Sequence, residues 1–363
     1  MGSKGLWPFA GGALLVDSLA PDILRLVRGQ RARMVAVFFH RNLGATPHAS
    51  AVRATKPMSA RAILGRLLGV IPTLLITWTV VFGAMRLVPG DPVLLMLQGT
   101  PISEAAVEAA RAKLGVDRPL VMQYVSFIGR ALVGDFGESF RSRQPVVRMI
   151  AAEFPNTLQL ALGGFFVGLV LGATLGVIAG VRPNGWVDTL CMTAALTGLS
   201  LPSFWIGMIL IQVFATQLGW VPVLGSGWDA LILPSITVGL FLAGGLARLT
   251  RNSIIEVMSQ DYIRTARAKG LTTIRVVAKH AMRNAVIPPL TLLGIQFALL
   301  IGGAVVTETV FARPGIGKLL VQAVLEKDFP VVQGIVVLTT GVYVLINVLI
   351  DIAYGIIDPR VQE

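Results

Sequence analysis

Six stretches of this chain are long and apolar enough to cross a lipid bilayer as helices. A spanning helix needs about 20 mainly apolar residues. Inside the bilayer each backbone polar group must be bonded within the protein, and single segments of this length achieve that as α-helices. The sequence therefore predicts an all-α polytopic membrane protein with six transmembrane helices. The predicted spans are approximately Leu67–Val88, Thr157–Val181, Thr189–Thr216, Ala230–Leu249, Val286–Thr307 and Val331–Asp351.

Composition and charge agree with a membrane location. Charged residues make up 14% of the 363 residues, whereas a soluble protein has roughly 25%. A net charge of +12 would suit a nucleic-acid partner, but the basic residues lie at the ends of the apolar spans. That distribution is typical of cytoplasmic membrane loops. We therefore expect a lipid membrane, and no nucleic acid, as a partner.

The distribution of Lys and Arg sets the orientation. Residues 1–60 and the loop at 250–285 carry an excess of basic residues, so both are predicted to be cytoplasmic. Residues 89–156 and the loop after the fifth span are neutral, so both are predicted to lie outside. With the first transmembrane helix at 61–88, six spans place both termini, including the tail 355–363, on the cytoplasmic side of a bacterial inner membrane.

The first 60 residues are rich in arginine and poorly periodic. We expect a disordered basic extension. A signal peptide is the alternative, but Pro8 interrupts the apolar stretch Leu6–Val16, and translocation of this end would oppose the charge bias.

The cytoplasmic loop contains the most unusual polar stretch of the chain, Asp261 to Gly270. Small residues alternate there with charged ones, which suits a short helix that presses closely against another protein. We interpret it as the segment through which a soluble partner drives this membrane subunit. The candidate coupling residues are Asp261, Arg264, Ala266, Arg267, Lys269 and Gly270.

Two features inside the spans concern helix packing. Gly164, Gly168, Gly172 and Gly176 recur every fourth residue, a row typical of close contact between membrane helices. Pro202 falls within the third predicted span, where it frees carbonyl groups and kinks a helix. The kink either helps a pathway to alternate between two openings or only shapes the bundle, and the two readings carry similar weight.

The sequence has no catalytic or metal constellation of its own. Gly315–Lys318 is too short at its front for a phosphate-binding loop and is followed by Leu319. The three histidines are isolated and lack metal-ligand spacing. No carboxylate lies near the middle of a span, as an ion-coupled carrier would need. We therefore expect a non-enzymatic transport subunit without a bound cofactor, which obtains its energy from other chains.

Four motifs resemble the permease subunits of ATP-binding-cassette importers, and more narrowly the B-type subunit of the oligopeptide/dipeptide permease family. They are Leu87-Val-Pro-Gly-Asp-Pro92, Gly134-Asp-Phe-Gly-Glu-Ser139, the cytoplasmic run Asp261–Leu271 followed by His280-Ala-Met-Arg-Asn284, and Glu308-Thr-Val-Phe-Ala-Arg-Pro-Gly-Ile-Gly317. In the wider superfamily the cytoplasmic loop reads Glu-Ala-Ala-x-x-x-Gly. Here Arg264-Thr265-Ala266 takes the first three positions and Gly270 the last, a variant similar to the peptide-importer group.

The resemblance implies the fold of type I importer permeases, with the shared transmembrane domain at 151–354. It also implies four partners: a second permease subunit, two cytoplasmic ATP-binding subunits that use ATP and Mg, and an extracytoplasmic solute-binding protein. The outer loop 89–156 is then either a docking surface for that protein or a cap over the bundle. The expected cargo is a dipeptide or oligopeptide, and related importers carry nickel chelates, glutathione or sugars. A self-contained secondary carrier or channel is the alternative function.

Overall fold

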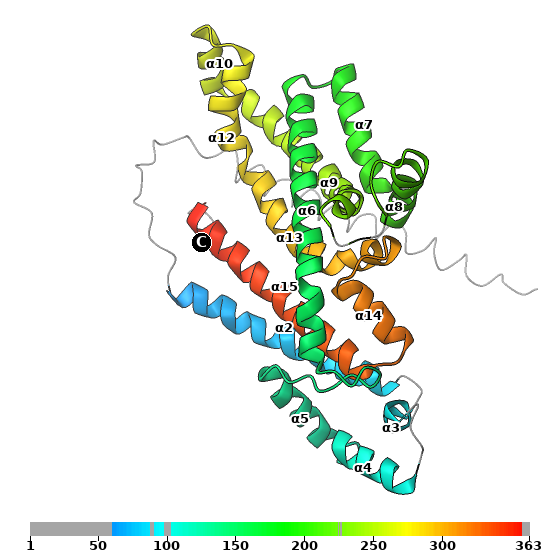
Figure 1. Cartoon of the computed structure of the whole chain (residues 1–363). Coiled ribbons are helices and arrows are strands. Elements are labelled where there is room, and N and C mark those ends of the chain that lie inside the picture. Colours follow the sequence, from blue (N-terminus) through cyan, green and yellow to red (C-terminus); the bar gives the residue numbers. More distant parts are fainter. Residues whose placement is uncertain (1–59, 88–90, 98–102, 224, 226, 358–363) are drawn as a thin grey trace, which may run out of the picture. The chain divides into compact units, whose positions relative to one another are not determined.

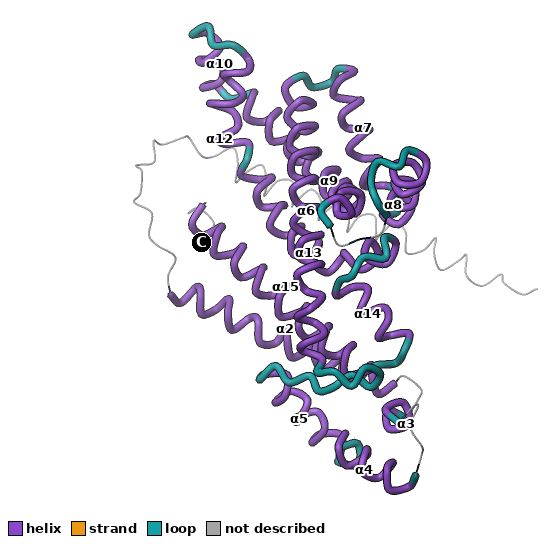
Figure 2. Tube along the Cα trace, viewed as in Figure 1, coloured by secondary structure: helices purple, strands orange, loops and turns teal. Residues whose placement is uncertain are grey.

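The computed structural model describes residues 60–87, 91–97, 103–223, 225 and 227–357, which all belong to one compact unit, Pro57–Glu363. Within these ranges the chain is helical, with no strand and a single isolated bridge between Glu138 and Pro145 (Figure 2). Apart from Ala60, the predicted N-terminal extension lies outside the described residues. So does the predicted tail from 358 onward.

Five long helices form the framework of the described unit (Figure 1). They are α2 (Ala60–Leu87), α6 (Val146–Val181), α9 (Ile232–Met258), α13 (Ile287–Val310) and α15 (Phe329–Ile357). Shorter elements connect them: α3 (Pro92–Met96), α4 (Glu104–Leu114), α5 (Leu120–Leu132), α7 (Trp186–Ser200), α8 (Ser203–Leu210), the π-helix η1 (Ile211–Gln217), the 3-10 helix η2 (Asp229–Leu231), α10 (Asp261–Ala268), α11 (Thr273–Arg275), the π-helix η3 (Val276–Ala281), α12 (Met282–Ala285) and α14 (Ile316–Leu325).

Four helical segments of the described chain are individually long and apolar enough to cross a membrane, and two bent pairs bring the number to six. The predicted kink at Pro202 divides the predicted span Thr189–Thr216 into two helical segments. The chain bends by 105° between α7 and the α8–η1 segment, and Pro202 stands immediately before α8 with an extended ψ of 130°. A proline restricts the residue before it to extended conformations, which explains why α7 ends at Ser200 and Leu201 has a ψ of 140°.

The other predicted spans shift at their ends. Helix α6 begins at Val146 rather than near Thr157, although Pro155 lies within it. Helix α9 continues past Leu249 to Met258 and so carries Arg251 toward the cytoplasmic loop. Pro288 and Pro289 occupy the first turn of α13, where a missing N–H costs nothing because no intrahelical acceptor exists for it.

The glycine row of α6 faces α9 along its whole length. A Cβ added to Gly168 would lie 2.6 Å from Leu242, and one added to Gly172 would lie 2.8 Å from Leu246. The same holds for Gly164 against Val238 at 2.9 Å. Any side chain at these positions would push the two helices apart, so the glycines permit the closest helix pair of the bundle.

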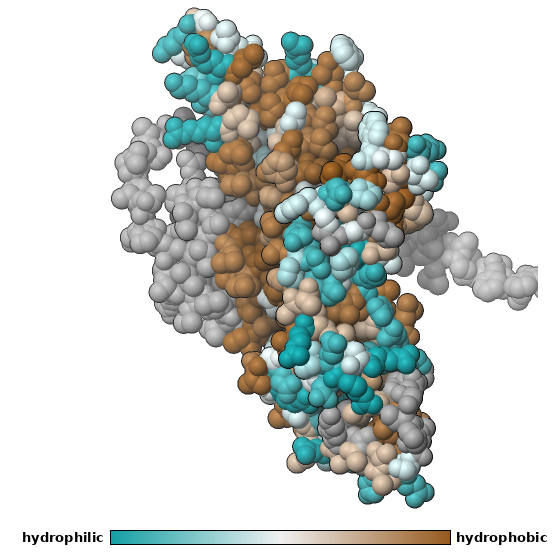
Figure 3. All heavy atoms as spheres, viewed as in Figure 1, coloured by the Kyte–Doolittle hydropathy of each residue, from teal (hydrophilic) through white to brown (hydrophobic). Residues whose placement is uncertain are grey.

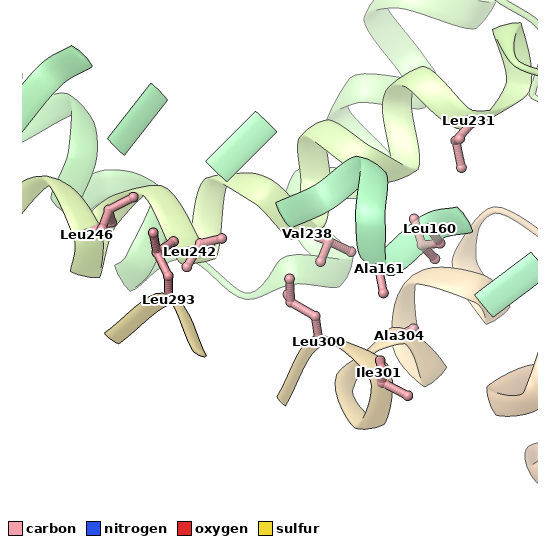
Figure 4. Packing of buried hydrophobic residues seen from close by; sticks show 10 residues of the cluster. All are labelled: Leu160, Ala161, Leu231, Val238, Leu242, Leu246, Leu293, Leu300, Ile301 and Ala304. Atoms are coloured by element: carbon pink, nitrogen blue, oxygen red, sulfur yellow. The ribbon is translucent and has the colours of Figure 1, made fainter. Parts of the chain in front are cut away.

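The main hydrophobic core lies beside this helix pair. It joins Leu160 and Ala161 of α6 and Leu242 and Leu246 of α9 to the apolar side of α13, as Figure 4 shows. The residues that α13 contributes are Leu293, Leu300, Ile301 and Ala304.

Candidate functional site

The loop that is predicted to be cytoplasmic forms the helix α10, and its two ends are defined by the sequence. Asp261 places a negative charge in the first turn, which is favourable at the positive end of the helix dipole. At the other end Gly270 adopts a φ of +76°, its N–H bonds the carbonyl of Arg267 at 2.9 Å, and the Leu271 N–H bonds that of Ala266 at 3.4 Å. These two bonds form a Schellman motif, which a glycine at this position satisfies without strain.

Two residues of α10 hold the helix on the rest of the chain. Ile263 and Ala266 are buried together with Val276 and Ala281 of η3. The expectation that Ala266 faces another protein is therefore corrected: its side chain packs inside the chain's own cluster. Gly270 also differs from the expectation, because its backbone conformation requires glycine, whereas a Cβ there would meet no atom within 4 Å.

The remaining residues of α10 form an exposed surface, which we call the docking face. Ile274 lies beside it in α11 and is 82% exposed, although it is a large apolar residue. Tyr262 accepts a hydrogen bond of 2.9 Å from the Asn284 side chain, which ties α10 to α12. Hydrophilic residues gather at this end of the molecule in Figure 3. The docking face comprises Asp261, Tyr262, Arg264, Thr265, Arg267 and Ala268 of α10 together with Lys269, which follows α10, and Ile274 of α11.

A buried ion pair holds α9, the helix that leads into this loop, against α7. Arg251 of α9 donates two hydrogen bonds, of 2.6 and 2.5 Å, to the two carboxylate oxygens of Asp188 in α7. The Asn184 N–H also donates to Asp188 at 2.8 Å, and Asp188 is only 4% exposed. A bidentate pair of this kind fixes both distance and angle between the two helices.

The bend at Pro202 borders a cavity of about 430 Å³. Its walls come from the α7–α8 junction, α9 and α13. Polar groups are few and neutral: Ser200, Ser203, Gln296 and Thr307. None of the residues that line it is ionisable, so a solute in the cavity would contact only uncharged side chains.

At the C-terminal end of α13, away from α10, the Glu308–Gly317 motif forms a buried cap. Thr157 donates to the Glu308 carboxylate at 2.6 Å, and the Lys318 N–H donates at 3.1 Å. A carboxylate at these amide groups satisfies the free N–H groups at the start of α14. Side chains at Gly315 or Gly317 would collide with Glu308 or Val305, which explains the glycines of the motif.

The Gly134–Ser139 motif is held against the start of α15. Ser139 donates to Asp328 at 2.5 Å, and the Phe140 N–H donates to the same buried carboxylate at 3.1 Å. Within the motif, the guanidinium of Arg130 donates to Asp135 at 2.9 Å and holds the pKa of Asp135 below its usual value. The Gly134–Ser139 and Glu308–Gly317 motifs therefore hold together segments that are distant in the chain.

Two family models match the chain. Residues 172–363 match the binding-protein-dependent transport system inner membrane component, and residues 59–161 match the N-terminal part of such membrane components. The chain belongs to this family.

Curated relatives cover most of this permease. The glutathione transport system permease protein GsiC of Escherichia coli (strain K12) is 44% identical over 301 residues, which are 83% of this chain and 98% of GsiC. GsiC of Salmonella typhimurium gives the same identity and coverage. Among solved structures, the inward-facing MetNI methionine ABC transporter matches at 21% identity and a TM-score of 0.47, over 59% of this chain and 96% of that chain.

The sequence located α10 but missed its supports. The structure brings Asp261, Arg264, Arg267 and Lys269 onto one exposed helix, and it turns Ala266 inward. Asp188 and Arg251 are 63 positions apart in the chain, and only the charge of Asp188 immediately before an apolar span indicates a partner. In the described part of the permease, no group of three or more His, Cys, Asp or Glu residues has the arrangement of a metal site.

Proposed function

We propose that this chain forms half of the translocation pathway of an ATP-driven importer and takes up short peptides of the glutathione class. A second permease subunit would supply the other half. A solute-binding protein would deliver the peptide from outside, and two ATPase subunits would act from the cytoplasm. The family membership and the 44% identity to a glutathione permease support this assignment.

The observation that carries the proposal is the docking face of α10. It presents the cations Arg264, Arg267 and Lys269 together with the exposed apolar residue Ile274. An exposed apolar residue within a ring of charges is typical of a protein interface. The net charge of this face is positive, so the partner groove should be acidic. In this proposal both termini, like the docking face, are cytoplasmic, in agreement with the excess of basic residues in the loop at 250–285.

ATP-driven closure of the ATPase subunits would then move α10 as a rigid body. Ile263 and Ala266 couple α10 to η3, and the Asp188–Arg251 pair couples α9 to α7. A push on α10 therefore reaches α7 and the bend at Pro202, beside the cavity. Rigid-body rotation of this kind is an established way to switch a pathway between two openings.

The cavity at Pro202 suits passage rather than tight binding of a peptide. A zwitterionic peptide would find only neutral polar groups there, among them Gln296 and Thr307. Without charged partners the pathway has little means to select or retain its cargo, so selection falls to the solute-binding protein.

A self-contained ion-coupled carrier is disfavoured by the way the buried acids are used. Among the described side chains, Asp188 is engaged by Arg251 and Asn184, and Glu308 by Thr157 and the start of α14. A carrier needs a carboxylate that can exchange its ion with the pathway, and neither of these two acids lines the cavity at Pro202.

Charge reversal on the docking face tests the proposal. The Arg264→Glu/Arg267→Glu double variant should lose co-purification with the ATPase subunits and lose ATP-driven uptake of labelled glutathione, because like charges would meet across the interface. Arg148→Glu, at an exposed position near the start of α6, is the matched control and should keep its co-purification with the ATPase subunits. Normal association and uptake by the double variant would refute the proposed coupling role of α10. Competition by unlabelled dipeptides then defines the cargo.

A further inference from the structure

Helix α5 of the outer segment has two apolar faces, and only one of them is covered by the protein. Tyr124, Phe127, Ile128 and Ala131 face α2 and α15. On another side Val121, Met122, Val125 and Leu132 are exposed, at 60% to 72% of their surface. At 100° per residue these four positions fall within an arc of about 100°. The exposed residues therefore form one continuous stripe, which we call the outer stripe.

On one side of α5 a polar strip lies between the outer stripe and the covered face, whereas on the other side the two apolar faces adjoin at Val121 and Ile128. The polar strip consists of Gln123, Ser126 and Arg130, and it lines a cavity of about 620 Å³ together with Arg86 and Arg118. The polar groups of α5 therefore already have an aqueous side of their own. A helix with this division of faces, and with basic residues near both ends, has the composition of helices that lie in a membrane interface.

Contacts with two spanning helices fix the depth of α5. The Tyr124 hydroxyl lies 2.6 Å from that of Thr79, and the Phe82 ring lies 5.4 Å from the Tyr124 ring. Thr79 stands eight residues before the outer end of α2, which is about 12 Å along the helix axis.

A second contact gives the same depth. Ala131 packs against Trp78 of α2 and Val337 of α15, and Val337 also lies eight residues inside the outer end of its helix. The hydrocarbon core of a bilayer is about 30 Å thick. A helix that touches both spans about 12 Å inside their ends lies level with the outer leaflet, not above the membrane.

We propose that α5 is an interfacial helix whose outer stripe is immersed in the acyl chains of the outer leaflet. The surface of α2 supports lipid as the occupant, because only 6% of its spanning window is buried inside the protein. Arg118 and Arg130, which line the cavity, would then stay on the aqueous side of α5. Through α5, the segment between the first two spans thus attaches the permease to the outer leaflet of the membrane.

Fluorescence quenching tests this placement in the complete transporter reconstituted into nanodiscs. The only cysteine, Cys191, is replaced by Ala, and an environment-sensitive label is attached at Val125→Cys. Val80→Cys of α2 is the lipid-facing control, since Val80 and Val125 are both 63% exposed. Glu108→Cys on the exposed side of α4 is the aqueous control. The quenchers are lipids with a nitroxide on the acyl chain near the headgroup, and iodide in the buffer.

The label at position 125 should be quenched by the nitroxide lipid as strongly as the label at position 80, and several-fold less by iodide than the label at position 108. Iodide quenching equal to that at position 108 would overturn the proposal. Protection from both quenchers that appears only when the solute-binding protein is added would also overturn it, because the outer stripe would then be a protein-docking surface.

Discussion

Removing the guanidinium of Arg251 should destabilise the cytoplasmic end of the bundle. In an Arg251→Met variant the carboxylate of Asp188, which is 4% exposed, would keep only the hydrogen bond from the Asn184 N–H. Breaking one side of a buried ion pair typically costs about 3–5 kcal/mol, because the remaining charge stays buried and unpaired. The lower end of that range applies here, since one hydrogen bond remains.

The assay is the apparent unfolding temperature of the purified complex in nanodiscs, followed by intrinsic tryptophan fluorescence. With an unfolding entropy of about 2.1 cal/mol/K per residue, a loss of about 3 kcal/mol corresponds to a decrease of roughly 4 °C for the 363 residues of this chain. Arg248→Met is the matched control: Arg248 lies in the same helix but is exposed, so its replacement should change the temperature by about 1 °C or less.

A double variant separates the charge from the packing. Asp188→Asn combined with Arg251→Met removes both charges, so it should recover more than half of the lost stability. The reasoning is refuted if Arg251→Met is no less stable than Arg248→Met, or if the double variant is no better than Arg251→Met alone. ATP-driven uptake should follow stability in the same order, because the pair joins α9 to α7.

Three further variants test other contacts. Gly176→Ala should destabilise the complex by about 1–3 kcal/mol, because the new Cβ would lie 2.6 Å from the backbone oxygen of Ala247, which cannot rotate away; Gly302→Ala, where a Cβ meets no atom within 4 Å, should show no loss in the same thermal assay. Gly270→Val should impair coupling and Gly270→Asn should retain it, as measured by uptake per ATP hydrolysed, because asparagine tolerates a positive φ; equal activity of the two variants would argue against a conformational role for this glycine. Glu308→Ala should cost about 1–3 kcal/mol through the lost cap of α14, and hydrogen exchange should become faster in the first turn of α14 while α10 stays unchanged.

Much of the membrane-spanning architecture could be predicted from the sequence, because length and hydrophobicity alone decide whether a segment can cross a bilayer. Pro202 predicts a kink in the third span, but not the bend of 105° that separates α7 from the α8–η1 segment, since both halves of the broken span are apolar. A window that averages hydropathy joins such halves into one span.

The features of the site also divide into those that the local sequence predicts and those that depend on distant contacts. The position and short length of α10 follow from its local sequence, ending at the glycine that its last turn requires. Its supports depend on contacts between distant segments, such as Asp188 with Arg251 and Ser139 with Asp328. Hydrogen-bonded pairs of residues so far apart in the chain are set by the packing of the whole bundle, and no local sequence pattern predicts them.

The central claim is that the energy for transport enters from other chains through α10. The most direct measurement is uptake of labelled glutathione, presented with its binding protein, by proteoliposomes that contain both permease subunits with or without the ATPase subunits. We expect uptake only when the ATPase subunits and ATP are both present. Concentrative uptake by the two permeases alone, driven by an ion gradient, would contradict the proposal that the ATPase subunits supply the energy.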